Sequence, residues 1–365
     1  MKTLICPDKF KGSLTAIEVA RAVKEGLPNH FRTTLIPMAD GGEGSLEVVA
    51  DNLERKQIYV TVNDPLFRPI SAKYFLSEET AYVEMAKASG YELLTDEERD
   101  CTKTTTFGTG ELIRNAINQG AKSIYLFVGG SATNDGGIGV AAALGYNFLD
   151  KSENELSPIG ENLIHIHEIR LPEKSLANVK FTVVCDVTNP FYGSNGAAHV
   201  YAAQKGANGK QILELDEGLQ NLTKIIKQQF GIDLQKLPGA GAAGGLGGGA
   251  IAFLNATVKS GTKTLIEITK LEEKIKSSDL IITGEGKVDK QSVSGKLIDG
   301  ICGIARTNNV PVWIICGISE ISQTDLASLG VAKVVELVNE ETPSDYAIQH
   351  AKILIERRIR TYFKE

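Results

Sequence analysis

TLICPDKFKGSL, residues 3–14, carries the first indication of a fold. Its apolar start is typical of a strand, a polar loop with one glycine ends that strand, and apolar residues at helical spacing then continue to Leu27. The order repeats at once, because a second apolar segment at 33–37 runs into the loop MADGGEG and then into a helical segment at 45–53. Two strand–loop–helix units in a row predict a parallel α/β sheet.

The C-terminal part of the chain follows the same alternation. We expect strands at 280–283, 312–316 and 331–338, and helices at 264–277, 293–307, 321–329 and 344–362. Together with the two early strands, these give the strand count of a five-stranded, doubly wound parallel domain.

The middle of the chain has a different character. Strand candidates at 58–62, 81–85, 123–128 and 181–185 are separated by longer polar stretches, and most of the 37 glycines lie in this part. We therefore expect an α/β protein in which a second α/β domain is inserted into a doubly wound domain. The expected boundaries are 1–60 plus 263–365 for the first domain and 61–262 for the inserted domain.

Length and composition exclude several classes of protein. At 365 residues, with 42% hydrophobic and 23% charged residues, the chain is long enough for about two globular domains and too apolar for a disordered protein. A net charge of −6 argues against a nucleic-acid partner and against a membrane surface. No apolar run is long enough to cross a membrane. The oligomeric state, a homo-oligomer included, stays open.

The five cysteines predict the redox compartment. They are odd in number, far apart and without a C-x-x-C pair, which indicates free thiols under reducing conditions. The N-terminus passes directly into a strand-like segment without the features of a signal peptide. We therefore expect a cytoplasmic protein whose partners are small molecules.

A glycine-rich segment at 239–244, GAGAAG, matches the G-x-G-x-x-G pattern of dinucleotide-binding proteins. That pattern needs a strand before it and an acidic residue about 20 positions later, but the preceding segment is polar and ends in Pro238. Gly241 and Gly244 are therefore candidates for a close backbone approach to a ligand, or for tight packing of small residues. An NAD-dependent dehydrogenase of a 2-hydroxy acid stays as an alternative function.

Residues 129–137, GGSATNDGG, follow a convincing strand and precede a helical stretch. A glycine-rich turn in this position can present backbone N–H groups and hydroxyls to an anion at a helix N-terminus. The candidate binding residues are Gly130, Ser131, Thr133, Asn134 and Asp135. The alternative is a tight turn in which Asp135 caps the helix.

Acidic residues follow three of the predicted strands, where the loops of an open α/β sheet face a ligand crevice. Asp40 lies in MADGGEG, Glu285 and Asp289 lie in TGEGKVD, and Asp186 comes directly after the strand at 181–185. Such carboxylates are suited to Mg²⁺ or to proton transfer. Alternatively, Asp40 caps a helix and Asp186 forms a turn.

Cationic side chains outline a complementary anion site. The loop after the first strand combines Lys9, Lys11, a glycine and Ser13, although a solvated loop capped by Ser13 is the alternative. Arg68 is a further candidate for binding a carboxylate, because its guanidinium can donate two parallel hydrogen bonds. The sequence has no Walker A, H-R-D, D-F-G, G-x-S-x-G or H-E-x-x-H motif, which excludes P-loop and protein-kinase machinery.

Several long strings, in order, resemble the bacterial-type glycerate kinase family. They are PDKFKGSL (7–14), ADGGEG (39–44), VEMAKASG (83–90), FGTGELI (107–113), GGSATNDGG (129–137), CDVTNP (185–190), QKGA (204–207), GAGAAGG (239–245) and ITGEG (282–286) with Asp289 and Gln291. The resemblance implies ATP-dependent phosphorylation of D-glycerate with Mg²⁺, with 2-phosphoglycerate favoured over 3-phosphoglycerate. It also implies a flavodoxin-like first domain. Lys9 and Phe67 depart from the pattern, which has serine and glycine at these positions.

Phosphoryl transfer needs charge neutralisation, a metal ion and a base near the hydroxyl. We expect Asp40, Glu285 and Asp289 to hold Mg²⁺ or to accept the substrate proton, with Asp186 as the other candidate base. The groups expected to bind the substrate anions are Lys9, Lys11, Ser131, Thr133, Asn134 and the backbone of 239–245. A non-catalytic two-domain protein that binds a small ligand is the second alternative.

Overall fold

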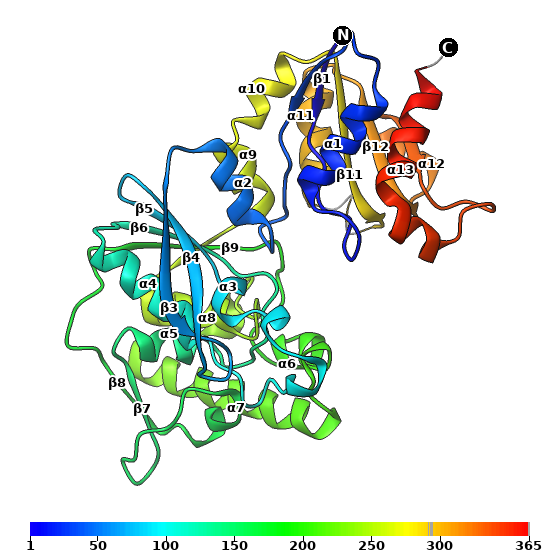
Figure 1. Ribbon diagram of the computed structural model, residues 1–365. Coiled ribbons are helices and arrows are strands. Elements are labelled where there is room, and N and C mark those ends of the chain that lie inside the picture. Colours follow the sequence, from blue (N-terminus) through cyan, green and yellow to red (C-terminus); the bar gives the residue numbers. More distant parts are fainter. Residues whose placement is uncertain (291, 293–294, 364–365) are drawn as a thin grey trace. The chain divides into compact units, whose positions relative to one another are not determined.

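The structure, a computed structural model, describes residues 1–290, 292 and 295–363. The chain forms two compact units, each with its own sheet and hydrophobic core (Figure 1). Unit 1 is made of Met1–Asp40, Glu47–Asn52 and Gly261–Glu365, and unit 2 of Gly41–Leu46 and Leu53–Ser260. The chain therefore leaves unit 1 to form unit 2 and then returns to complete unit 1.

Unit 1 is built on five parallel strands in the spatial order β13-β12-β11-β1-β2. Their bounds are β1 Lys2–Ile5, β2 Arg32–Leu35, β11 Leu280–Val288, β12 Val312–Ser319 and β13 Val331–Glu336. Counted along the chain within this unit, the order reads 2-1-3-4-5, which is the flavodoxin-like arrangement. The predicted α/β fold with a flavodoxin-like parallel domain is confirmed.

Helices cover both faces of this sheet. They are α1 Ala16–Gly26, α9 Gly261–Ile268, α10 Leu271–Lys276, α11 Leu297–Thr307, α12 Gln323–Ser328 and α13 Ser344–Tyr362, while α2 Ser45–Asn52 is divided between the units. α1 and α13 lie side by side (Figure 1), and their buried Val23 and Ile355 share a core with Ile5 of β1. The connections β1-α1-β2 and β11-α11-β12 run in opposite directions along the sheet, so right-handed crossovers place α11 on the other face.

Unit 2 has a six-stranded mixed sheet in the order β10-β9-β6-β5-β4-β3. β5, β6, β9 and β10 are parallel, whereas β4 is antiparallel to both of its neighbours. The strands are β3 Lys56–Asn63, β4 Pro69–Ser77, β5 Thr80–Glu84, β6 Ser123–Phe127, β9 Lys180–Val184 and β10 Thr257–Lys259. β7 Asn147–Leu149 and β8 Glu168–Arg170 form a separate antiparallel pair.

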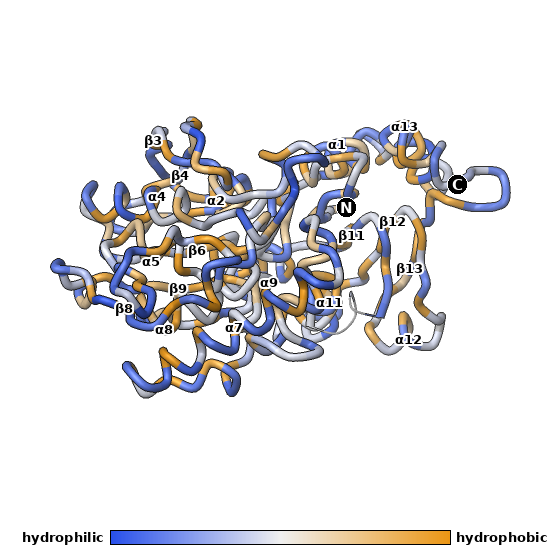
Figure 2. Tube along the Cα trace, turned by 90° about the horizontal axis from the view of Figure 1, so that it is seen from below, coloured by the Kyte–Doolittle hydropathy of each residue, from blue (hydrophilic) through white to orange (hydrophobic). Residues whose placement is uncertain are grey.

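The helices of unit 2 share one apolar core with the interior strands. They are α3 Ala86–Ser89, α4 Phe107–Asn118, α5 Ile138–Ala143, α6 Ala197–Tyr201, α7 Gly209–Phe230 and α8 Leu246–Leu254, with short 3-10 turns η1 Tyr91–Leu93, η2 Asp96–Glu98, η3 Gly160–His165, η4 Ala203–Lys205 and η5 Leu234–Lys236. Leu112, Ile124 and Phe253 are buried in this core. Figure 2 shows the hydrophobic stretches of β6 and α8 that contribute to it.

The structure differs from the predicted elements at three places. β3 begins at Lys56 and pairs with β4, so this strand belongs to unit 2 and the chain enters that unit before the predicted residue 60. The predicted helix 264–277 is two helices, α9 and α10, because Lys270 between them has a left-handed φ of 50°. β11 continues beyond the predicted end at 283, because β12 pairs with it as far as Val288.

Some predictions lie outside the described residues. These are Gln291 and the first two positions of the helix predicted at 293–307, which is described as α11 from Leu297. None of the helices formed by the described residues combines the length and apolar composition that a membrane crossing requires. The five cysteines are free.

Candidate functional site

The acidic edge of unit 1 consists of Asp8, Asp40 and Glu285. Asp8 and Asp40 follow β1 and β2, and Glu285 lies in β11, which pairs with β1 on the side opposite β2. Backbone hydrogen bonds between the strand ends hold these positions together. Asp8 N donates to Gly284 O across 2.8 Å, and Met38 N donates to Pro7 O across 2.9 Å. The parallel strands therefore bring three acids to one edge of the sheet.

Burial and neighbouring negative charge raise the pKa of two carboxyl groups of the acidic edge. Burial, and after it the charges of Asp40 and Glu285, raise the pKa of Asp8 to about 8. Burial also raises the pKa of Glu285, with further contributions from the charges of Asp289 and Asp40. A cation at this edge would offset the charge and favour the ionised carboxylates. Asp8 was missed in the sequence, although its position after β1 is equivalent to that of Asp40 after β2.

The donor set of the acidic edge fits Mg²⁺, which binds carboxylate oxygens and usually keeps water or substrate phosphate in its shell. Among the described residues, no group of three or more histidine, cysteine or acidic side chains could by itself hold a metal ion. An ion with one or two protein carboxylates needs no such cage when a phosphate completes its shell. Asp289, the remaining predicted ligand, follows β11 and bonds to Ser292 through its backbone N–H.

The cationic loop after β1 adjoins the acidic edge. Lys11 is exposed, and Lys9 is half-buried. The Lys9 backbone N–H donates to the Asp8 carboxylate across 2.6 Å, and the Lys9 charge lowers the pKa of Asp8 against the larger effect of burial. The candidate cations and the candidate metal ligands of unit 1 thus occupy neighbouring loops, as a site for a metal-bound anion requires.

Ser13 has a different role from the predicted cap. Its hydroxyl donates to the backbone oxygen of Ile348 in α13 across 2.5 Å. Helix α1 is instead capped by Thr15, whose side chain and backbone form a reciprocal pair with Glu18. The alternative of a loop capped by Ser13 is therefore wrong, since the helix begins two residues later.

The glycine-rich loop of unit 2, residues 129–137, joins β6 to α5. Asp135 in this loop is completely buried, and its carboxylate accepts hydrogen bonds from the backbone and hydroxyl of Thr106 and from the backbones of Gly137 and Gly139. Burial raises the pKa of Asp135, while these four donors oppose the increase. The carboxylate ties the start of α5 to the start of α4, which supports the capping alternative over contact with a substrate.

Lys205 was not among the sequence candidates. Its side chain is buried, and its ammonium donates to Ser131 Oγ across 2.7 Å and to Thr133 O across 2.8 Å. Thr133 and Asn134 are completely buried in the same loop. The string QKGA contains this lysine, but nothing in the sequence indicated that it would meet the glycine-rich loop, which lies some seventy positions earlier in the chain.

Asp186 follows the parallel strand β9 in unit 2, whereas Asp40 belongs to unit 1. The Asp186 carboxylate accepts a hydrogen bond from the hydroxyl of Ser260 across 2.6 Å. Ser260 follows β10, which pairs with β9, so the neighbouring strand orients this carboxylate. The position suits a base because a held carboxylate that is partly exposed can still accept a proton.

Gly241 and Gly244 precede α8 and follow the turn η5, so no strand leads directly into this segment. A Cβ atom on Gly241 would stand 2.2 Å from the backbone oxygen of Pro190, and one on Gly244 would stand 2.0 Å from that of Thr133. The glycines thus allow close backbone approach within unit 2. The structural context of a dinucleotide fingerprint is missing.

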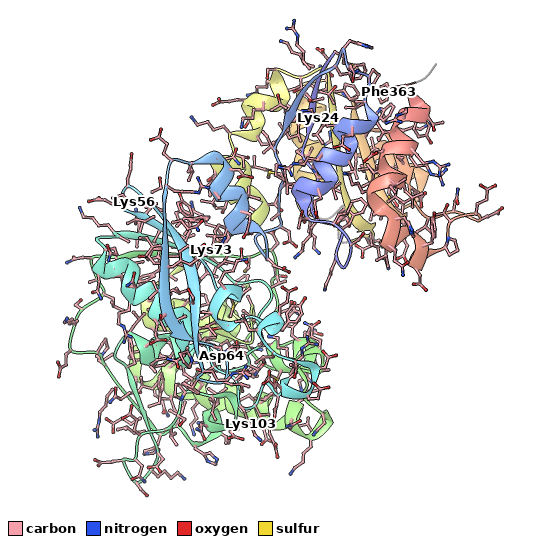
Figure 3. All side chains as sticks on the ribbon, viewed as in Figure 1. Lys24, Lys56, Asp64, Lys73, Lys103 and Phe363 are labelled. Atoms are coloured by element: carbon pink, nitrogen blue, oxygen red, sulfur yellow. The ribbon has the colours of Figure 1, made fainter. Side chains whose placement is uncertain are left out.

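Arg68 forms ion pairs with Asp64, labelled in Figure 3, and with Glu98, each at 2.5 Å. The guanidinium that the sequence assigned to a substrate carboxylate thus pairs with two carboxylates of the protein, and its binding of a substrate stays a prediction. The preceding residue, Phe67, has a left-handed φ of 60° and a ring that lies 5.9 Å from that of Phe107. Glycine adopts such a conformation more readily than phenylalanine does.

A pocket of about 400 Å³ lies in unit 2. This volume is within the range of small-molecule sites. Its lining includes Glu84, which is completely buried, pairs with Lys87 at 3.4 Å and accepts the backbone N–H of Leu46. Lys73, labelled in Figure 3, and Gly130 of the glycine-rich loop also line it. The pocket therefore adjoins the loop that the sequence assigned to anion binding.

Comparison with known proteins decides between the candidate functions. A model of the glycerate kinase family matches residues 3–364. The chain belongs to the glycerate kinase family. Membership makes the protein a kinase, and a kinase uses ATP, so the dehydrogenase and the non-catalytic binding protein fall away. The resemblance stated from the sequence strings is confirmed.

Individual glycerate kinases match along most of their length. The glycerate kinase of Halalkalibacterium halodurans is 40% identical over 366 residues, which cover 98% of this chain and 96% of that protein. The glycerate 2-kinase of Escherichia coli K12 is 41% identical over 324 residues, covering 87% and 85%. A crystal structure named glycerate kinase 2, from Salmonella typhimurium LT2, matches with a TM-score of 0.84 at 36% identity over 100% of this chain and 97% of that one.

Proposed function

We propose that the protein transfers the terminal phosphoryl group of ATP to D-glycerate, with the 2-hydroxyl as the favoured acceptor and Mg²⁺ as the metal. The observation that carries the proposal is the acidic edge of unit 1, where the parallel strands bring Asp8, Asp40 and Glu285 to one edge of the sheet. Such an arrangement is stabilised by a divalent cation. Among kinase substrates, the polyphosphate of ATP is the natural carrier of that cation.

Two tasks remain for side chains of this chain. The first is to accept the proton of the glycerate hydroxyl as its oxygen attacks phosphorus, for which Asp40 and Asp186 are the proposed bases. The second is to bind the anionic groups, for which Lys9 and Lys11 are proposed at the acidic edge. Mg²⁺, when bound, neutralises charge on the phosphate oxygens. Its one or two protein ligands are proposed to come from Asp40, Glu285 and Asp289.

We also propose a cytoplasmic location. The five free cysteines support it, because such thiols persist in a reducing compartment. Four of them are buried, and burial raises the pKa of Cys101 and Cys185 to about 11, so both remain protonated and unreactive at neutral pH.

The test of the proposed function is an ADP-release assay with D-glycerate, L-glycerate, glycerol or no acceptor, each with and without Mg²⁺. We expect ADP release that requires both D-glycerate and Mg²⁺. Phosphorus NMR of the product then identifies the acceptor hydroxyl. ADP release at the same rate without any acceptor, or with glycerol as the better acceptor, would contradict the proposal.

A further inference from the structure

A buried cation in unit 2 is bonded to no carboxylate of the residues that the structure describes. The ammonium of Lys205, a residue only 5% exposed, donates to a hydroxyl and to a backbone oxygen, both neutral. The ionisable groups that act on it through space are Asp135 and the Cys101 thiol. Asp135 directs its oxygens to Thr106 and the start of α5, and the Cys101 thiol donates to the backbone oxygen of Ala202. Burying an ammonium in this way costs free energy of folding unless an anion binds to it.

The loop to which Lys205 bonds carries polar atoms without a hydrogen-bond partner among the described residues. They are Thr133 Oγ1 and both Oδ1 and Nδ2 of Asn134, in side chains that are completely buried. Buried polar groups in native proteins are almost always satisfied, so a cluster of unsatisfied atoms points to a missing ligand or water. We call the set Ser131, Thr133, Asn134 and Lys205 the Lys205 site.

The chemistry of the Lys205 site selects an anion. An ammonium, an amide N–H and a hydroxyl are all hydrogen-bond donors, and together they match the oxygens of a carboxylate or phosphate. The site also adjoins a cavity along the chain. Gly130, the residue before Ser131, lines the pocket of about 400 Å³ described above. A cavity of this volume is large enough for a small anionic ligand.

We propose that the Lys205 site binds one anionic group of the substrates, either the carboxylate of the acid acceptor or a phosphate group of the nucleotide. This inference rests on the proposed function for the identity of the substrates, but not for the existence of the site. Because burial lowers the pKa of Lys205 to about 8, anion affinity should fall as the pH rises through that value. Cys101, with a pKa raised by burial to about 11, stays neutral in this range.

The first experiment compares Lys205→Met with Lys210→Met, whose lysine lies at the exposed start of α7. Calorimetric titration of the full chain uses inorganic phosphate, D-glycerate and a non-hydrolysable ATP analogue. We expect Lys205→Met to weaken one ligand by about tenfold or more, the effect of one charge-assisted hydrogen bond, and Lys210→Met to change none. Loss confined to D-glycerate identifies the carboxylate, and loss confined to phosphate and the analogue identifies the nucleotide.

The pH dependence separates ligand binding from a merely structural role. In the unmodified protein the affected ligand should bind less tightly at pH 9 than at pH 7, and Lys205→Met should remove that difference. If Lys205→Met folds and binds all three ligands within about twofold of the unmodified protein, the proposal is overturned.

Asn134→Leu provides a second variant that decides the matter if Lys205→Met does not fold. Leucine keeps the shape of asparagine and removes two unsatisfied buried atoms, so the protein should melt at the same or a higher temperature. The proposal requires that anion affinity nevertheless falls by about tenfold. Unchanged affinity would refute it. A different result is a protein that binds phosphate in a Lys205-dependent way and yet shows no glycerate kinase activity. That result would contradict the proposed function but support the Lys205 site.

Discussion

Gly244 lies against the backbone of Thr133 so closely that a Cβ atom on the glycine would stand 2.0 Å from the threonine carbonyl oxygen. The glycine also has a left-handed φ of 68°. Because glycine tolerates both the short distance and this φ, the segment before α8 can pack directly on the glycine-rich loop after β6. The sequence presents these two stretches as separate motifs. The loop that carries Thr133 and Asn134 is therefore fixed in place by packing against the backbone of Gly244.

Gly244→Ala should destabilise the protein by about 2 kcal/mol or more, because the methyl group collides with backbone and the φ value disfavours any side chain. Urea unfolding followed by circular dichroism measures the change. Gly209→Ala is the matched control, since a Cβ atom there meets nothing within 4 Å. Equal stability of the two variants would show that the close approach does not exist.

Asp135→Asn should also destabilise the fold, because the amide nitrogen of asparagine would face N–H donors that the carboxylate now accepts. The expected loss is about 2 kcal/mol, typical of leaving buried donors unsatisfied. Asp345→Asn, at an exposed position in the first turn of α13, serves as the control. If Asp135→Asn keeps full stability but loses substrate affinity, Asp135 contacts the substrate after all.

Phe67→Gly and Phe67→Ala both remove the ring contact with Phe107, but they differ in tolerance of the left-handed φ. The glycine variant should be more stable than the alanine variant by about 1 kcal/mol. Both variants lose the ring contact, so the difference in their stability reports the cost of the left-handed backbone conformation. Thermal melts of the two proteins measure it, and an alanine variant that melts at the higher temperature would contradict the assigned backbone conformation.

Lys205 should make stability depend on pH in an unusual direction. Its pKa is about 8 in the folded protein against the ordinary 10.5, so between these values the unfolded chain binds more protons and stability rises with pH. The difference in unfolding free energy between the unmodified protein and Lys205→Met should therefore shift in favour of the unmodified protein from pH 7.5 to 10, by an amount on the order of 3 kcal/mol at its limit. Denaturant titrations at several pH values measure the difference. A constant difference would mean that the ammonium is solvated.

Asp40→Asn should lower kcat by about 100-fold or more, whether the carboxylate holds Mg²⁺ or accepts the proton. The two roles separate in the kinetics, because loss of a ligand raises the Mg²⁺ concentration needed for half-maximal rate and loss of a base does not. Asp51→Asn, on the exposed side of α2, is the control. Activity of Asp40→Asn within a few-fold of the unmodified protein would remove Asp40 from the site.

The sequence predicted most of the fold because its strands and helices alternate with clear periodicity. It could not place residue pairs that meet through tertiary packing. Lys205 and Ser131 are 74 positions apart, and no local pattern links them. Asp135 was assigned from its place in a glycine-rich turn between a strand and a helix, which suits a cap as well as a binding group. Its complete burial and four internal donors favour the cap.

The errors at element boundaries have local causes. Ser13 and Thr15 are both good caps by type, and the packing of Ser13 against α13 decides between them. The break between α9 and α10 depends on one lysine in a left-handed conformation that lysine rarely adopts, so propensity predicted a continuous helix. Asp8 stands in the sequence beside Lys9 and close to Lys11, a pattern that indicates anion binding rather than a carboxylate site.

The pairing of β1 with β11 joins residues 277 positions apart, as in the hydrogen bond from Thr283 to Cys6. During synthesis, β1 therefore lacks its partner β11 until all of unit 2 has been made. A folded unit 2 brings its two ends together and lowers the entropy lost when β11 arrives. Until then the apolar edge of β1 is open to other chains, so newly made protein should be most prone to aggregate in the interval before β11 leaves the ribosome.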